Sequence, residues 1–440
     1  TQSGALTIST GLPDYDNFSR SAVTLNPQAW NQDGITTLLT ARLADRFNNP
    51  IQDGTAITFT TELGSIESSC ITAGGACSVT WTSQSPRGSS GPGSNAGRTT
   101  ILATVIGEES FVDVNGNGIY DDNDGTANFT DLPEAFRDDN EDNIRDSSEP
   151  FVDFNNNGIY DGVDSLFNGV QCTHSSECSP TETLSVRDSI VLVMSEDNPQ
   201  IIKIEDSSSV LCDNTDGNFT NDCYNDGVNT VLPLTYPSVI KLGSVANTLT
   251  FTIVGNTNHQ VMPVGTKVDF SVDNGKIVSG ASQVVLNTNG NTATSLTVAQ
   301  YPVTLDKDTT ASFDGNLTLK VEPKNGPITT FQSIALDDRP LFITFDLPTS
   351  TTFNSSVAFN LSGTAIDPED GDISANITWT SDIDGALGTG KTVNVNTAGS
   401  PLNNGGGASG SSVVHTITAS ITDSDSNIRE VTKAITIKVP

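Results

Sequence analysis

Three acidic loops in one stretch of the chain, residues 111–164, have the residue types and the spacing of calcium ligands. Each loop spans twelve residues and places oxygen-bearing side chains at positions 1, 3, 5, 9 and 12. Position 7 is always Ile, which offers only its backbone carbonyl, and position 6 is Gly or Asn, which turn the chain most easily. Six or seven hard oxygen ligands on a flexible loop suit Ca²⁺ better than Mg²⁺ or a transition metal.

We name these the first, middle and third loop, and residues 111–164 the triple-loop segment. The candidate ligands of the first loop are Asp113, Asn115, Asn117, Ile119, Asp121 and Asp124. Those of the middle loop are Asp138, Asn140, Asp142, Ile144, Asp146 and Glu149. Those of the third loop are Asp153, Asn155, Asn157, Ile159, Asp161 and Asp164. We expect about three bound Ca²⁺ ions, with the middle loop binding tightest because it carries the most carboxylates.

A solvated acidic linker is the alternative interpretation of this segment. It does not explain why each loop has a Phe two residues before its first Asp, or why the Ile and Gly/Asn positions recur. Pro133, Pro150 and Ser/Asn-rich sequence flank the loops and do not sustain helices. The segment therefore resembles the helix-free calcium loops of extracellular proteins, such as thrombospondin type 3 repeats. That resemblance implies that the ions are structural and do not signal.

The composition limits the partners of the chain. The 440 residues carry 20 Lys and Arg against 53 Asp and Glu, a net charge of −33. This charge argues against binding to nucleic acid or to an anionic membrane surface, and it fits a calcium-rich exterior in which cations relieve self-repulsion. No apolar run is long enough to span a bilayer. Since the sequence begins at Thr1, we interpret it as a processed chain or as a piece of a longer one.

Six cysteines occur as three near pairs, Cys70/Cys77, Cys172/Cys178 and Cys212/Cys223. Six cysteines allow 15 connectivities, and pairing of near neighbours is the simplest, because each pair closes a short polar loop. Metal binding by these cysteines is disfavoured, because the three His residues have no ligand spacing. Paired cysteines predict an oxidising compartment.

The remaining sequence predicts an all-β fold of tandem immunoglobulin-like β-sandwiches with a long irregular calcium-binding insertion. Runs with a period of two, rich in Thr, Val and Ile, alternate with Gly/Pro/Asn turns over residues 5–106 and recur at 184–194. Residues 37–64 resemble the bacterial immunoglobulin-like domains of the invasin/intimin group. We expect a first domain over 1–198 whose last two strands, 99–106 and 184–194, enclose an insertion at about 107–181.

Two further domains follow. The pattern Gly265-Thr-Lys-Val268-Asp-Phe270 repeats Gly54-Thr-Ala-Ile57-Thr-Phe59 at a constant offset of 211 residues, which predicts a second copy of the sandwich over 199–340. Residues 341–440 resemble the cadherin- and PKD-like modules of bacterial surface proteins, with Trp379 as the core Trp. Whether the acidic loops at 367–372 and 212–227 also bind Ca²⁺ is left open.

One motif matches a nucleotide-binding pattern but lacks its context. Residues 385–392 fit the P-loop letter by letter, but a P-loop requires a preceding parallel strand and a following helix. We expect a hairpin turn between two strands there and no nucleotide binding. We find no nucleophile or zinc motif and expect no enzymatic activity and no catalytic residues.

The sequence thus predicts an extracellular or cell-surface structural protein of bacterial type, stabilised by Ca²⁺ and disulfides. It would be the subunit of a pilus-like filament, self-associating through edge or terminal strands, or the stalk segment of an adhesin, in contact with neighbouring immunoglobulin-like domains. A carbohydrate- or ligand-binding accessory module of a secreted protein is the contrasting interpretation. Exposure of Trp30 and of the six Tyr residues would favour that module.

Overall fold

A computed structural model describes residues 11–88, 95–206, 210–213, 239–241, 246–255, 259–273, 275–290, 297–306, 315–326, 328–330, 334–337, 342–355, 357–367, 370–397, 402–403, 409–423 and 428–439. The regular elements in these ranges are strands, apart from three short 3₁₀ helices: η1 (Tyr15–Asn17), η2 (Thr297–Ala299) and η3 (Ser374–Asn376). The expected all-β class with immunoglobulin-like sandwiches is confirmed.

The first sandwich packs two four-stranded sheets around one apolar core. One sheet has the order β1 (Phe18–Ala22), β2 (Thr36–Leu43), β6 (Ala76–Thr82) and β4 (Ser65–Ile66). The other has the order β5 (Ser69–Ile71), β3 (Ala56–Thr61), β7 (Arg98–Gly107) and β8 (Leu184–Val193). Leu39, Ala41 and Leu43 of β2 alternate with more exposed residues, as the period of two predicts. Trp81 is fully buried between the sheets.

The second sandwich has its own core, centred on Phe251 and Phe270. One sheet has the order β10 (Val210–Asp213), β9 (Gln200–Glu205), β12 (Asn247–Val254), β16 (Gln300–Asp306) and β14 (Lys276–Ser279). The other has the order β11 (Val239–Lys241), β19 (Ile334–Asp337), β17 (Gly315–Glu322), β13 (Lys267–Val272) and β15 (Ser282–Val284), with β18 (Thr329–Thr330) also paired to β17. Strands β3 and β13 begin 211 residues apart, the same offset as the sequence repeat.

The third sandwich encloses Trp379, which is fully buried, as the sequence predicts. One sheet contains β20 (Phe342–Leu347), β22 (Phe359–Asp367), β23 (Gly371–Asp372) and β26 (Thr392–Val395). The other has the order β21 (Thr352–Asn354), β28 (Ile428–Lys438), β27 (Ser412–Thr422), β24 (Thr378–Ser381) and β25 (Gly385–Thr389).

The expected hairpin at the P-loop-like residues 385–392 is wrong. Strand β25 pairs with β24, whereas β26 pairs with β22 in the opposite sheet. The chain therefore crosses from one sheet to the other at Gly390, which has a φ of 137°. A strand follows this turn, and the helix that a P-loop requires is not present at 392–395.

The long insertion leaves and re-enters the first sandwich at neighbouring strands. Strands β7 and β8 pair antiparallel along their whole length, from Arg98 opposite Val193 to Gly107 opposite Leu184. Everything between Gly107 and Leu184 is irregular chain that carries the triple-loop segment. A connection of this length without regular structure needs another source of order.

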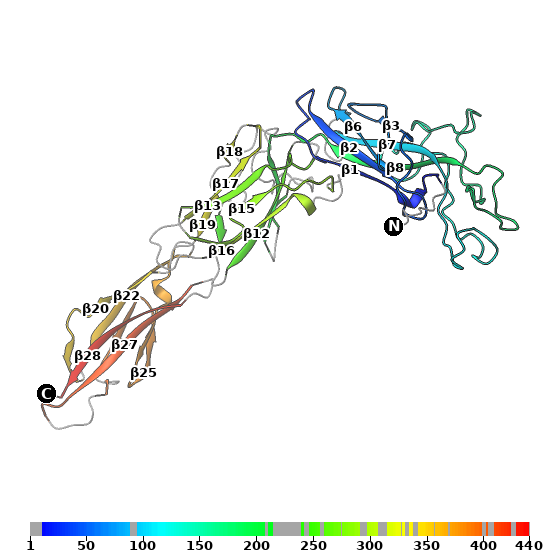
Figure 1. The fold of residues 1–440 in the computed structure, drawn as a ribbon. Helices are drawn as coiled ribbons and strands as arrows, with labels where there is room; N and C mark the ends of the chain where they lie inside the picture. Colours follow the sequence, from blue (N-terminus) through cyan, green and yellow to red (C-terminus); the bar gives the residue numbers. More distant parts are fainter. Residues whose placement is uncertain are drawn as a thin grey trace, which may run out of the picture.

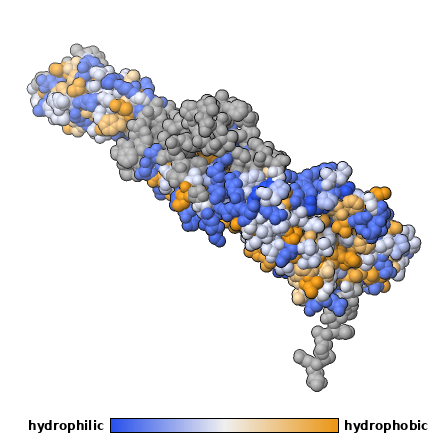
Figure 2. All heavy atoms as spheres, turned by 90° about the horizontal axis from the view of Figure 1, so that it is seen from above, coloured by the Kyte–Doolittle hydropathy of each residue, from blue (hydrophilic) through white to orange (hydrophobic). Residues whose placement is uncertain are grey.

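The three sandwiches follow one another in an elongated row, with the C-terminus at the end away from the first sandwich (Figure 1). Polar residues cover much of the visible face, and exposed apolar residues gather most at the end formed by the first sandwich (Figure 2). In the described part of the chain, we find no helix long and apolar enough to cross a membrane.

Gly64 lies directly against Trp81 in the core of the first sandwich. A Cβ atom at Gly64 would lie 2.7 Å from three ring atoms of Trp81, whereas a Cβ at Gly54 would meet no atom within 4 Å. Both residues have positive φ, so both Ala substitutions carry the same type of backbone penalty. We predict that Gly64→Ala lowers the stability of the first sandwich by about 1–3 kcal/mol more than Gly54→Ala does, measured by calorimetric unfolding. Equal losses would contradict this packing.

Candidate metal centre

The first Asp of each loop organises the loop around its own carboxylate. One oxygen of Asp113, Asp138 and Asp153 accepts a hydrogen bond from the backbone N–H at position 5, at 3.0–3.1 Å. The other oxygen accepts from the N–H at position 6, at 2.7–2.8 Å. Three stretches of different sequence therefore adopt one local structure, which is set by the position of this Asp.

The side chains at positions 3 and 5 continue the pattern. Each Asn at position 3 accepts from the N–H at position 5, at 2.9–3.0 Å. Each oxygen at position 5 accepts from the N–H of the Ile at position 7, at 2.7 Å in all three loops. An oxygen that accepts one hydrogen bond retains a second lone pair. The Ile side chains of the middle and third loops are 68% and 67% exposed, so these residues offer the loop their backbone alone.

The chain turns at two left-handed residues in each loop. Position 6 was expected to turn, and Gly118, Asn143 and Gly158 have φ values of 75°, 64° and 76°. Position 4 also turns, at φ values of 73°, 63° and 58°. The residues at position 4 are Gly116, Glu141 and Asn156. Sequence analysis missed this second turn, because Glu rarely adopts a positive φ.

A further carboxylate closes each loop by joining position 2 to position 9. In the first loop, Asp124 accepts from the N–H groups of Val114 and Asp121, at 2.8 and 2.9 Å. In the middle loop, Glu149 accepts from those of Asp139 and Asp146, also at 2.8 and 2.9 Å. Asp124 and Glu149 are the residues at position 12, and both are buried.

In the third loop, a carboxylate from outside the loop takes this place. Glu134 accepts from the N–H groups of Phe154 and Asp161, at 2.8 and 3.1 Å. Asp164, the residue at position 12, is exposed and accepts instead from the N–H of Leu166. A cavity of about 150 Å³ beside the third loop is lined by Glu134, Asp161 and Asp164, among others. Glu134 lies nineteen residues before Asp153, the first residue of the loop. A search for ligands at the fixed spacing of a twelve-residue loop therefore could not find it.

In each loop, carboxylate and amide oxygens thus accept hydrogen bonds from the backbone N–H groups of the loop. In the described part of the chain, no three His, Cys, Asp or Glu side chains stand together as a preformed metal cluster. The Asn amides of the third loop donate to Asp161, at 2.6 and 2.8 Å. Binding of a cation would therefore require these amides to turn their oxygens inward, a small movement for an exposed loop. A hard divalent cation of the size of Ca²⁺ accepts such mixed oxygen sets.

Two groups of aromatic rings hold the loops together. Phe111, Tyr120, Phe129 and Phe167 pack with ring centroids 5.1–5.8 Å apart. Tyr160 packs edge-on against Phe136 and Phe151, and the guanidinium of Arg145 lies over the rings of Phe151 and Tyr160. These small cores contain the Phe residues that precede the three loops.

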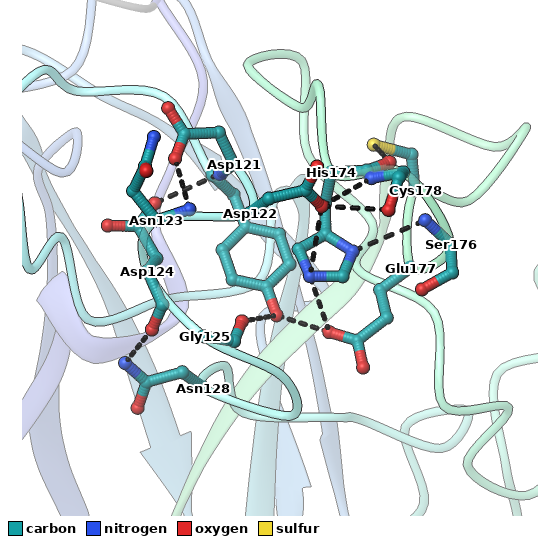
Figure 3. Close-up of polar contacts among 12 residues, drawn as sticks. Asp121, Asp122, Asn123, Asp124, Gly125, Asn128, His174, Ser176, Glu177 and Cys178 are labelled. Atoms are coloured by element: carbon teal, nitrogen blue, oxygen red, sulfur yellow. Dashed lines mark hydrogen bonds and ion pairs between the residues drawn. The ribbon is translucent and has the colours of Figure 1, made fainter.

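A His-centred bridge joins the end of the first loop to the Cys172–Cys178 loop (Figure 3). His174 stacks on Tyr120 with centroids 5.2 Å apart, and its Nδ1 accepts from the N–H of Ser176. The ring proton therefore belongs on Nε2, which lies 3.6 Å from Asp122 and 3.7 Å from Glu177. A metal on Nε2 would place a proton on Nδ1 against the N–H of Ser176, so His174 is a bridging residue and a poor metal ligand.

The Tyr120 hydroxyl completes this bridge by donating to the carboxylate of Glu177. Burial, together with this hydrogen bond, raises the pKa of Tyr120 to about 12. The same hydrogen bond, with one from the N–H of Ala127, lowers the pKa of Glu177 below its ordinary value. The hydroxyl thus stays protonated and the carboxylate ionised, which keeps the first loop attached to the disulfide loop.

Two disulfides lie within the described residues. Cys70–Cys77 joins β5 to β6, which belong to opposite sheets of the first sandwich, and Cys172–Cys178 closes the short loop beside Tyr120. Both are among the expected local pairs. Cys212 is also disulfide-bonded, and Cys223, its expected partner, lies outside the described residues.

Charged side chains, one buried and two half-buried, attach the triple-loop segment to the first sandwich. Glu109 accepts from the N–H groups of Leu132 and Asn168, and burial raises its pKa to about 7. Arg137 and Arg187 donate to the backbone carbonyls of Thr61 and Pro133. The segment is therefore fixed to the sheet at several points along its length.

The other acidic loops give little support for further sites. At 367–372, Asp372 lies 3.3 Å from the ammonium of Lys391, which supplies a cation from within the chain. Glu369 and most of the loop at 212–227 lie outside the described residues.

No protein-family model matches the sequence, and no match was found among the curated proteins. Several solved structures are similar at low identity. The Escherichia coli adhesin FdeC has 8% identity and a TM-score of 0.33, over 99% of this chain and 100% of that one. InvD of Yersinia pseudotuberculosis has 14% identity and a TM-score of 0.30, over 96% and 98%. Invasin, a bacterial integrin-binding protein, has 11% identity and a TM-score of 0.25, over 96% of this chain and 60% of that one. At these TM-scores the similarity carries no argument about the function of this chain.

Mutagenesis can distinguish Glu134 from Asp164 as the candidate ligand of the third loop. In a background with Asp113→Asn and Asp138→Asn, only the third loop keeps its first Asp. We predict that Glu134→Gln then weakens Ca²⁺ binding at least about tenfold, because it removes the carboxylate that closes the loop. The measurement is calorimetric titration of the chelated chain. Asp164→Asn removes the same charge from an exposed position and serves as the matched control, with little expected effect. The opposite order would restore Asp164 as the ligand.

Proposed function

We propose that this chain is a stiff, Ca²⁺-stabilised segment of an extracellular bacterial surface protein, acting as the stalk of an adhesin. The recurring loop geometry carries the proposal. An irregular insertion in the first sandwich forms the same oxygen-lined loop three times, with a carboxylate at position 1 and another closing each loop. Nothing in an unpaired linker would select this arrangement repeatedly.

The charge of the chain supports a cation-dependent structure. Within twelve residues the first and third loops each carry three candidate carboxylates and the middle loop carries four, in a chain whose net charge is −33. Like charges at such short range repel one another, and a bound divalent cation converts this repulsion into attraction. Asp113, Asn115 and Asn117 of the first loop are exposed, so an ion can reach the loop from solvent.

The joint between the first and second sandwiches supports a stiff stalk. Asn26 is fully buried there, and its amide nitrogen donates to the carbonyls of Met262 and Leu286, at 2.9 and 3.0 Å. Its side-chain oxygen accepts from the N–H of Thr288 at 3.1 Å. Val193, the last residue of β8, packs into the core of the second sandwich. Relative motion of two domains is limited when they share buried contacts of this kind.

The disulfides support a location outside the cytoplasm, because paired cysteines stay oxidised in extracellular compartments.

A filament subunit is the second candidate, because a row of sandwiches could also join end to end through terminal strands. The carbohydrate-binding alternative gains no support within the described residues, where Trp30, Tyr15 and Tyr160 are half-buried and Trp81, Trp379, Tyr120 and Tyr301 are buried.

Removal of calcium tests the proposal. We predict that the first sandwich unfolds at a clearly higher temperature in millimolar Ca²⁺ than in chelator. Binding to the native state alone stabilises by about 4 kcal/mol per site at a thousandfold excess over Kd. The measurement is scanning calorimetry, with electron microscopy of the same samples.

The third sandwich is an internal control, because it lacks such loops within its described residues and its transition should not move. Extended monomers in Ca²⁺ support the stalk, and fibres that disappear on chelation support the filament. An unchanged first transition would contradict calcium stabilisation altogether.

A further inference from the structure

The middle loop contacts the joint between the first two sandwiches through one arginine. The side chain of Arg98, at the start of β7, is only 4% exposed. Its Nε and Nη2 donate to the two carboxylate oxygens of Glu141, at 2.6 and 2.7 Å. Its Nη1 donates to the backbone carbonyl of Asn289 in the second sandwich, at 3.1 Å. One guanidinium thus joins the middle loop to the neighbouring domain.

The surrounding contacts place this arginine at the centre of the joint. Arg98 lies opposite Val193 in the β7–β8 ladder, and Val193 packs into the second core. Asn289 returns a hydrogen bond from its side chain to the carbonyl of Val191 in β8, at 2.8 Å. The middle loop approaches the same place, since Asn95 donates to the carbonyl of Asn140 and Thr100 to that of Asp138.

The backbone of Glu141 gives a second, independent reason to connect the loop with the joint. Glu141 occupies position 4, between the candidate ligands Asn140 and Asp142, at a φ of 63°. The equivalent residues in the other loops are Gly116 and Asn156, which adopt positive φ at little cost. A Glu in this conformation is strained, and such strain persists where other interactions of the residue compensate for it. Here the compensating interaction is the two-point contact of the Glu141 carboxylate with Arg98.

We propose that the middle loop is a calcium-dependent latch between the first and second sandwiches. The proposal rests on calcium binding by the loops and adds a role for which the described residues give no counterpart in the other two loops. A cation held by Asn140 and Asp142 fixes the strained turn between them and so holds the Glu141 carboxylate against Arg98. Arg98 then holds Asn289. Without the cation the turn relaxes, and the buried guanidinium loses its paired charge.

Hydrogen exchange measured by mass spectrometry on the full chain tests the latch. The readout is a peptide covering residues 286–290, in which the amide of Thr288 donates to Asn26 across the joint. We expect Ca²⁺ to slow exchange in this peptide about tenfold relative to chelator, although it belongs to a sandwich that the loops do not enter. The variant Glu141→Gly should abolish this difference, because it removes the side chain but retains a residue suited to the turn.

Asn156→Gly is the matched control, since it makes the same kind of change at position 4 of the third loop. It should leave the protection of 286–290 unchanged. Calcium titration of both variants should still show the same number of bound ions as the unaltered chain. Protection that is equal in Ca²⁺ and chelator, or that survives Glu141→Gly, would overturn the latch while calcium binding stands. No calcium binding by the unaltered chain would overturn both proposals.

Discussion

The structure depends on carboxylates that replace a sheet as partners for backbone N–H groups. The insertion between β7 and β8 has no ladder of its own, and buried or turning backbone must still form its hydrogen bonds. Asp113, Asp138 and Asp153 satisfy the N–H groups at positions 5 and 6, and a closing carboxylate satisfies those at positions 2 and 9. The shape of the loops and the positions of their turns follow from these few acceptors.

The same arrangement creates a problem of charge. Acceptors that order the backbone also concentrate negative charge in a chain that has little Lys or Arg to balance it. Two arginines make specific contacts in this region. Arg145 lies over the aromatic rings between two loops, and Arg98 pairs with Glu141 at the joint. In our proposal, a small cation at each loop balances this charge, because it can approach several oxygens at once.

The sequence predicted features that depend on local pattern and missed features that depend on contacts between residues distant in the sequence. The period of two predicted the strands at 99–106 and 184–194, which are β7 and β8, and Trp379 is buried in the third core as expected. The hairpin expected at 385–392 was wrong, because the choice of sheet at a turn depends on which partner strand is already there. Glu134 could not be found by spacing, since it reaches the third loop from a separate part of the chain. The strained turn at Glu141 is likewise explained only by Arg98, which is distant in sequence.

The measurement that tests the account most directly is the number of calcium ions bound per chain, determined by native mass spectrometry after equilibration in millimolar Ca²⁺. The account predicts three ions, and the loss of one ion for each of Asp113→Asn, Asp138→Asn and Asp153→Asn, because each change removes the carboxylate around which one loop is built. A count of zero, or a count that these substitutions leave unchanged, would contradict the assignment of the loops as calcium sites.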